Sequence, residues 1–327
     1  MHQYQAQVRD DRIHITRQDA ALPLPGPRQL LVRVQAAGLN RGEILALRQA
    51  KAGSPAAGLG IEAAGEIVAV GADGGPFQVG QRVMGRCKGA FAEHVLLDAR
   101  DAMPVPDALS WTQAAAIPIA SMVVYDMLVM QGRLEAGEWL LVTGISSGVG
   151  VAALQLAKAL GARVIGTSGS TEKLAALKKE GLDLGIQTRS PDFHDAVMSA
   201  TEGRGADLVV NIVGGSVLAE CVRSMAFQGR LATVGYVDGV TSGPLDLAAL
   251  HSRRLQLFGV SSKGLNAAQR QDIVQGVIRD VLPLIADGRI LPVVDRVYPM
   301  EQLAQAIEHL ESNAQLGKIV VSGAQAG

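Results

Sequence analysis

The sequence predicts an α/β fold in which a doubly wound parallel sheet is joined to a second, β-rich part. Residues 139–173 contain an apolar run, a glycine-bearing turn, a helical pattern and a second apolar run. After this unit, strand-like and helical patterns alternate about every twenty-five residues. Residues 1–100, by contrast, contain short strand-like runs separated by glycine and proline. Together these patterns predict two domains rather than one core.

The unit that begins at residue 139 predicts a nucleotide site. Leu140–Thr143 is short enough for a buried strand, and Gly144–Gly150 is the turn before a helix that ends at Gly161. Backbone N–H groups in such a turn, together with the helix dipole, favour a pyrophosphate. Ile145 and Ser147 stand at the first two glycine positions of the G-x-G-x-x-G motif. An ordinary tight turn in an α/β core is therefore the alternative.

The elements follow in order along the chain. Before residue 110, we expect strands in residues 1–37, clearest at 30–38, then a helix after Asn40 and three further strands. These further strands are 61–71, 81–86 and 91–97. Helical spacing begins at Trp111. The strands expected in the wound sheet begin with LLVTG, RVIGTS, LGIQT, DLVVNIV, RLATVGY and LQLFGV.

Alternation of this kind predicts parallel strands with right-handed crossovers. The wound domain is placed at residues 119–259. A helix at 267–287, the strand-like PVVDRVYP, the helix MEQLAQAIEHLES and the strand KIVVS follow it. This tail is too short for a domain of its own, so we expect it to return and complete the first one.

Composition limits the partners. Of 327 residues, 48% are hydrophobic and 19% are charged, with a net charge of -1. This gives no electrostatic reason to expect nucleic acid or an anionic membrane surface. Two cysteines are too few for a disulfide framework. The N-terminal residues show no signal-peptide pattern, and Pro118 and Asp126 interrupt the longest apolar stretch. We therefore expect a cytoplasmic protein without a membrane span.

Along its whole length the chain resembles the medium-chain dehydrogenase/reductase superfamily, and within it the zinc-independent quinone oxidoreductase branch. The motifs that carry this resemblance are AAGLNRGEIL, GLGIEAAGEIVAVG, GQRVMG with GAFAEHV, VTGISSGVGVAALQLAKALGARVIGT, and LATVGY. The resemblance implies a Rossmann NADP-binding domain at residues 119–259. It also implies a GroES-like catalytic domain, which holds the substrate, made of residues 1–118 and 260–327.

No metal site is expected. Zinc-using relatives have a cysteine at the position of Asn40 and a histidine at that of Ile61, whereas catalytic zinc needs about three protein ligands. The six histidines are scattered without ligand spacing. Glu43 and Glu62 match acidic positions of the superfamily, and without a metal we interpret them as structural partners.

The cofactor is predicted from the end of the second wound strand. An NAD site would place an acidic residue there for the ribose, whereas this chain has Thr167 to Thr171. Lys173 lies where NADPH-using relatives hold the 2′-phosphate, with Ser168 and Ser170 as further donors. NADPH is therefore the expected cofactor. The alternative is that Lys173 is a solvated helix lysine.

The remaining site residues are assigned by turn position or resemblance. The expected cofactor contacts, besides Ser168, Ser170 and Lys173, are Ser146, Ser147, Gly148, Val149, Gly150, Val213, Gly235, Tyr236 and Asn313. Val123 replaces a threonine common in relatives, so Tyr125 or Ser121 is expected to supply that polar contact. Asn40 is the candidate for a contact at the reacting end, or else a loop asparagine that caps a helix.

These residues predict an NADPH-dependent reductase that transfers hydride to a small molecule, either a quinone or another electron-poor carbonyl or alkene. The alternative enzyme is an enoyl or alkenal/one reductase on the same scaffold. A third possibility, from another class, is a non-catalytic NADPH-binding protein with a structural or RNA-binding role. Family resemblance also implies a homodimer formed through the edge strand Leu255–Val260.

Overall fold

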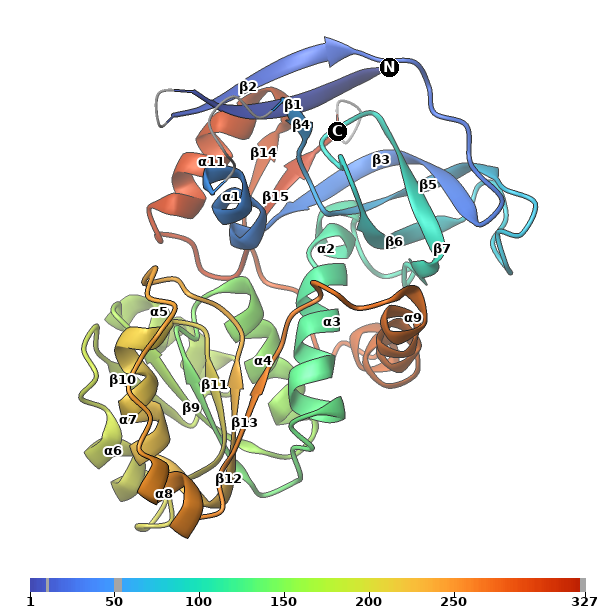
Figure 1. Ribbon diagram of the computed structural model, residues 1–327. Coiled ribbons are helices and arrows are strands. Elements are labelled where there is room, and N and C mark those ends of the chain that lie inside the picture. The colour runs from blue at the N-terminus through green and yellow to red at the C-terminus, as the bar shows by residue number, and fades with distance from the viewer. Residues whose placement is uncertain (10–11, 50–54, 324–327) are drawn as a thin grey trace. The chain divides into compact units, whose positions relative to one another are not determined.

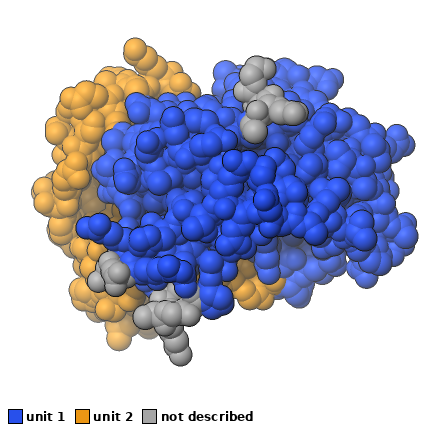
Figure 2. All heavy atoms as spheres, turned by 90° about the horizontal axis from the view of Figure 1, so that it is seen from above, with its two compact units in different colours: residues 1–122, 266–327 blue, residues 123–265 orange. Residues whose placement is uncertain are grey.

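The computed structural model describes residues 1–9, 12–49 and 55–323. It divides into two compact units, coloured in Figure 2: unit 1 is Met1–Met122 with Asn266–Gly327, and unit 2 is Val123–Leu265. Segments 119–122 and 260–265 therefore fall on the other side of the boundaries expected from the sequence. The assignment of cofactor binding to one domain and substrate binding to the other stays a prediction.

Unit 2 contains the parallel sheet that the sequence predicted. All neighbouring strands are parallel, and their order is β10-β9-β8-β11-β12-β13. The strands are β8 (Trp139–Thr143), β9 (Arg163–Ser168), β10 (Leu184–Gln187), β11 (Ala206–Asn211), β12 (Met225–Thr233) and β13 (Gln256–Gly259). The helices around them (Figure 1) are α4 (Gly148–Ala159), α5 (Thr171–Lys179), α6 (His194–Ala200), η2 (Gly215–Val217), α7 (Leu218–Arg223) and α8 (Leu247–Ser252).

The strand order reverses direction at β8. The chain winds outward through β9 and β10 on one side, then returns to β11 and continues through β12 and β13 on the other. Ligands of wound sheets bind outside the carboxyl ends of the strands at such a reversal. The loops that follow β8, β9, β11 and β12 are therefore the expected position of a bound cofactor.

Unit 1 is built mainly from antiparallel strands. A sheet of order β2-β1-β4 is formed by β1 (His2–Arg9), β2 (Arg12–Asp19) and β4 (Ala57–Gly58). A second sheet has the order β14-β15-β3-β5-β6-β7, and β7 also pairs with β3, so β3, β5, β6 and β7 close on themselves. Its strands are β3 (Gln29–Leu39), β5 (Glu62–Val70), β6 (Arg82–Cys87), β7 (His94–Pro104), β14 (Val294–Pro299) and β15 (Lys318–Ser322).

The C-terminal tail completes this second sheet, as the sequence predicted. β15 pairs antiparallel with β3, where Val320 faces Gly38, and β14 pairs with β15. The helices of unit 1 are α1 (Arg41–Arg48), α2 (Trp111–Ala115), α9 (Ala267–Gly276), α10 (Leu282–Ala286), α11 (Leu303–Glu311) and the short η4 (Met300–Gln302). α3 (Pro118–Tyr125) begins in unit 1 and continues into unit 2, where the π-helical turn η1 (Asp126–Met130) follows.

Two predicted elements differ from the structure. The single helix expected over 267–287 is interrupted by the π-helical turn η3 (Val277–Val281). Pro283 at the start of α10 has no N–H to continue the helical ladder, which accounts for a break at this point. The strand expected at 91–97 begins at His94 and runs on to Pro104. Phe91 instead accepts a hydrogen bond from the Tyr4 N–H group through its carbonyl oxygen.

Across the described ranges, no helix has the length and apolarity needed to cross a bilayer. Cys87 and Cys221 are both buried free thiols, one in each unit. Burial raises the pKa of both thiols far above the ordinary value, so neither is a reactive thiolate at neutral pH.

Candidate functional site

The glycine turn delivers the N-terminus of α4 directly from the end of β8. Ser147 is the N-cap residue, and its hydroxyl accepts a hydrogen bond of 3.1 Å from the Gly150 N–H group. Gly144 has φ +65°, which favours glycine. A Cβ on Gly150 would lie 2.5 Å from the carbonyl oxygen of Ile145, so only glycine lets the helix approach this closely.

Ile145 explains why the motif departs from the common glycine pattern. Its side chain is fully buried. A Cβ placed on Gly166 of β9 would lie only 2.4 Å from Ile145 Cδ1. The isoleucine therefore packs into space that the neighbouring strand leaves open at Gly166. With isoleucine at position 145 and glycine at position 166, the turn stays tight and gains an apolar contact with β9.

Polar residues at the end of β9 meet the glycine turn. The hydroxyls of Ser168 and Ser146 are 3.5 Å apart. Ser170 is the N-cap of α5, where it accepts a hydrogen bond from the Lys173 N–H group at 3.2 Å. The structure thus brings Ser146, Ser168, Ser170 and Lys173 into one region, which we call the serine cluster.

Arg189 is a residue of this region that sequence reasoning missed. A Cβ on Gly169, between Ser168 and Ser170, would lie 2.6 Å from Arg189 Nε and 2.7 Å from its Cζ. The guanidinium group therefore rests against the backbone of the serine cluster. The available signal was strand order: β10 lies beside β9, so the loops that follow the two strands are neighbours.

Glu172 also reaches the serine cluster. Its carboxylate accepts a 2.7 Å hydrogen bond from the Ser170 hydroxyl, and this bond is the main cause that lowers the pKa of Glu172. The region therefore places the guanidinium group of Arg189 and one exposed carboxylate beside the N-terminus of α5, where the Lys173 N–H group is bonded. An incoming phosphate would compete with Glu172 for the Ser170 hydroxyl.

The loops after β11 and β12 contain the residues assigned to the nicotinamide end. Val213 and Gly235 are partly exposed, and Tyr236 is 44% exposed. The two loops are bonded to each other, because the Asp238 N–H group donates to the Val213 carbonyl at 2.9 Å. Asp238 was not among the predicted site residues.

In unit 1, Asn40 belongs to a buried charged cluster. Its Oδ1 accepts a hydrogen bond from Lys318 Nζ at 2.5 Å, and its Nδ2 donates to Glu62 Oε1 at 2.8 Å. Lys318 Nζ lies 2.6 Å from the same Glu62 oxygen. Glu62 has no exposed surface and Lys318 only 7%. A lysine ammonium group is therefore the cation held by Asn40 and Glu62.

Glu43 supports the same loop from within α1. One carboxylate oxygen accepts from the Asn40 N–H group and the other from the Gly60 N–H group, each at 2.8 Å. Burial raises the pKa of Glu43 to about 7, although these two hydrogen bonds oppose the shift. Glu43 and Glu62 are thus both bonded to protein groups, and their role as structural partners stays a prediction.

The two predicted catalytic residues, Asn40 and Tyr125, and the predicted cofactor contact Asn313 take different positions. Asn40 is the N-cap residue of α1, but its side chain is bonded to Lys318 and Glu62, so it combines a cap position with a charged network. Asn313, in unit 1, accepts a 2.7 Å hydrogen bond from Arg41. Tyr125, in unit 2, is 3% exposed. The contacts of all three with substrate or cofactor stay predictions.

The described residues include no group of three or more His, Cys, Asp or Glu side chains that could hold a metal ion. Oε1 of Glu62 is bonded to Asn40 and Lys318, and Oε2 accepts from the Ile119 N–H group. Metal independence itself stays a prediction.

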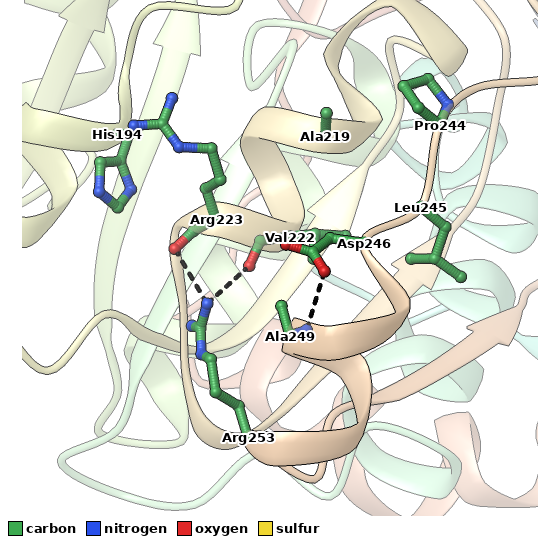
Figure 3. A pocket seen from close by; sticks show the side chains of 9 residues that line it. All are labelled: His194, Ala219, Val222, Arg223, Pro244, Leu245, Asp246, Ala249 and Arg253. Carbon is green, nitrogen blue, oxygen red and sulfur yellow. Dashed lines mark hydrogen bonds between the residues drawn. The ribbon is translucent and has the colours of Figure 1, made fainter.

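A hollow of about 480 Å³ on unit 2 is lined by none of the predicted site residues (Figure 3). Arg253 donates to the carbonyls of Val222 and Arg223, and Asp246 accepts from the Ala249 N–H group. Arg223 is paired with Glu220. Because Arg253, Asp246 and Arg223 already have partners within the protein, we assign no ligand to this hollow.

Comparisons with known proteins agree with this architecture. The family model described as alcohol dehydrogenase GroES-like domain matches residues 26–107, and the one described as zinc-binding dehydrogenase matches residues 148–281. Prostaglandin reductase-3 of Mus musculus is 31% identical over 320 residues, covering 93% of this chain and 84% of its own length.

Two further similarities concern a longer protein and a solved structure. A phenolphthiocerol/phthiocerol polyketide synthase of Mycobacterium tuberculosis is 33% identical over 307 residues. The alignment covers 93% of this chain, which spans only 14% of the synthase's length. The crystal structure of Escherichia coli quinone oxidoreductase complexed with NADPH has a TM-score of 0.88 at 25% identity, covering 98% of this chain and 100% of that one.

The buried cluster makes unit 1 sensitive to loss of Lys318. We expect Lys318→Met to lower the free energy of unfolding by about 3–5 kcal/mol, because it leaves the Glu62 carboxylate buried without its cation. The matched control is Arg33→Met, which breaks a half-exposed pair with Glu66 and should cost less than about 1 kcal/mol. Urea unfolding followed by Trp111 fluorescence in a Trp139→Phe background measures both. Equal losses would contradict the assignment.

The raised pKa of Glu43 predicts a pH dependence. Its ordinary value is 4.5 and its folded value about 7, so the folded state holds the proton more tightly. This contribution to stability is complete below pH 4.5 and is lost as pH rises to 7, by about 3 kcal/mol in all. Glu43→Gln has no such proton, so its stability deficit relative to wild type should shrink between about pH 5 and pH 8. Urea titrations that show a constant or growing deficit would refute this.

Proposed function

The chain belongs to the medium-chain dehydrogenase/reductase superfamily, and on that premise we propose that it is a zinc-independent, NADPH-dependent oxidoreductase. Its substrate would be a quinone or another electron-poor carbonyl or alkene. The observation that carries the proposal is the serine cluster, where Ser146, Ser168, Ser170, Lys173 and Arg189 gather beside the glycine turn. NADPH, when bound, supplies a hydride from nicotinamide C4.

The first role of the protein would be to bind the phosphate groups of NADPH. The N–H groups of Gly148 and Val149 belong to the first turn of α4, where helical N–H groups have no intrahelical partner, and they would bind the pyrophosphate. Ser146 and Ser147 border the same turn. Lys173 and Arg189 would hold the 2′-phosphate by charge-assisted hydrogen bonds, and the hydroxyls of Ser168 and Ser170 would add neutral ones.

The other end of the cofactor would lie along the loops after β11 and β12. Val213, Gly235 and Tyr236 would border the nicotinamide, in keeping with their position beyond the carboxyl ends of parallel strands. Asn313 remains a proposed further contact. The protein's contribution is then to orient the ring and to exclude water from it.

Asn40 and Tyr125 are the residues we propose at the reacting end. Asn40 is held in one orientation by Lys318 and Glu62, which suits a residue that must present a fixed polar group. A role for solvent as the proton donor fits the absence of a Ser-His-Asp arrangement among the predicted site residues.

Reduction of an enoyl or alkenal/one substrate is the second candidate. The chain's similarity to prostaglandin reductase-3 and to a segment of a polyketide synthase favours it. Both candidates need the same cofactor and differ in the acceptor. Cytoplasmic location is an expectation from the sequence alone.

A substrate panel tests the proposal. NADPH oxidation is measured with quinones, enals, enones and enoyl thioesters, with and without exhaustive chelation of metals. We expect turnover with at least one class, unchanged by chelation. If NADPH binds and no class is reduced, the proposal of catalysis is wrong and a non-catalytic role is favoured. Stoichiometric zinc lost together with activity would refute metal independence.

Cofactor preference is tested at the serine cluster. A charge-assisted hydrogen bond has a net value of about 1.5–3 kcal/mol, so Lys173→Ala and Arg189→Ala should each weaken NADPH binding roughly ten- to a hundred-fold. NADH lacks the 2′-phosphate, so its affinity should change little. Lys178→Ala, at the far end of α5, is the control. Equal loss for NADPH and NADH, or equal wild-type affinity for both, would refute the phosphate assignment.

A homodimer is also proposed, through the edge strand β13. This strand pairs with β12 on one side, and Leu257 is 37% exposed. An unpaired edge with exposed apolar residues favours pairing with a second copy. Light scattering should give twice the 34.1 kDa of one chain, and Leu257→Lys should shift the protein toward the monomer. A wild-type monomer at micromolar concentration would contradict the dimer.

A further inference from the structure

The loops after β11 and β12 are joined through one carboxylate, that of Asp238. Its Oδ2 accepts hydrogen bonds from the Ser216 N–H group at 3.0 Å and from the Ser216 hydroxyl at 2.5 Å. Its Oδ1 accepts from the Val240 N–H group at 2.8 Å. The backbone adds further bonds: Asp238 N–H to the Val213 carbonyl at 2.9 Å, Gly215 N–H to the Val240 carbonyl at 2.8 Å and Val237 N–H to the Ile212 carbonyl at 3.4 Å.

Gly214 makes room for this carboxylate. Its φ is +131°, a conformation that glycine adopts and other residues rarely do. A Cβ built at this position would lie 2.0 Å from Asp238 Oδ1. The carboxylate thus occupies the space where a side chain would be, so the two loops cannot come together this way with another residue at Gly214.

The same turn is anchored on its inner side by buried residues. Asn211 accepts from the Gly214 N–H group at 3.0 Å and donates to the Gly214 carbonyl at 2.9 Å. The Thr143 hydroxyl lies 3.2 Å from Asn211 Oδ1 and accepts from the Ile212 N–H group at 3.1 Å. The carboxyl ends of β8, β11 and β12 are therefore connected by one polar network, whose outer member is Asp238.

Asp238 differs from Thr143 and Asn211 because it lies on the exposed side of this network. Burial tends to raise its pKa, but the hydrogen bonds from Ser216 and Val240 outweigh that effect, so the pKa is lower than usual. The group is charged at neutral pH. Its removal leaves the donors of Ser216 and Val240, which are exposed and can bond to water, so we expect the loops to loosen without general unfolding.

We propose that Asp238 is a positioning residue that holds segments 213–216 and 235–240 together as one rigid border for the nicotinamide ring. This inference rests on the proposed function, because that function places Val213, Gly235 and Tyr236 beside the ring. Hydride transfer depends on near-attack geometry, and a displacement of about 1 Å can cost on the order of a hundred-fold in rate. A loosened border would therefore impair orientation more than phosphate binding.

The test compares Asp238→Ala and Asp238→Asn with a matched control, Asp246→Ala. Asp246 is also an exposed carboxylate that accepts a backbone N–H group in unit 2, at Ala249, but no hydrogen bond found among the described residues joins it to segment 213–216. We expect Asp238→Ala to lower kcat about ten- to a hundred-fold while the affinity for 2′,5′-ADP, which has no nicotinamide, changes less than about threefold. Asp238→Asn keeps one acceptor and should restore part of the rate.

A binding readout separates this inference from the proposed function. Wild-type protein that binds NADPH but reduces nothing refutes the catalytic proposal alone. Hydrogen exchange of residues 212–217 with NADPH bound then decides the inference, which requires faster exchange in Asp238→Ala and not in Asp246→Ala. Wild-type exchange and kcat in Asp238→Ala would overturn it. An equal loss of 2′,5′-ADP affinity would also overturn it, since it would indicate a general structural role.

Discussion

The fully buried carboxylate of Glu62 is the constraint on which unit 1 depends. A charge without access to water must be paired and hydrogen-bonded, and the groups that satisfy Glu62 come from three distant segments. These are the Asn40 side chain after β3, Lys318 at the start of β15 and the Ile119 N–H group in α3, at 2.8 Å. Gly38 leaves the space for it, because a Cβ there would lie 2.3 Å from Glu62 Oε1.

In unit 2, the turns at the edge of the sheet are held mainly by hydrogen bonds between neutral polar side chains and the backbone. Its parallel strands end at a common edge, and short polar side chains at that edge bind the turns that follow. Ser147 and Ser170 cap helices, while Thr143 and Asn211 hold the turn after β11. Arg189 rests against the backbone at Gly169, and the Lys173 N–H group is bonded to the Ser170 hydroxyl. A buried charge thus joins distant segments in unit 1, whereas neutral side chains hold the turns at the edge of the unit 2 sheet.

Sequence periodicity predicted most of this fold because each strand and helix is a local pattern. The six strands of the wound sheet, the β-rich start and the return of the tail were all expected and are present. What the sequence could not supply was proximity between loops. Arg189 follows a different strand from Ser168, and Lys318 begins a short apolar run that indicates only a strand. Periodicity also does not specify where a helix changes its hydrogen-bond pattern. In the helix expected over 267–287, the π-helical turn η3 lies just before Pro283.

The route of the chain through the two units has a consequence for biosynthesis. Unit 2 is one continuous segment, whereas unit 1 lacks β14 and β15 until all of unit 2 has been translated. At about 5–20 residues per second, Lys318 leaves the ribosome roughly ten to fifty seconds after Glu62. During that interval the carboxylate has no ammonium partner, and the β3 edge that β15 will cover is open to wrong pairing. The nascent first unit therefore keeps an incomplete sheet until β14 and β15 have been synthesised.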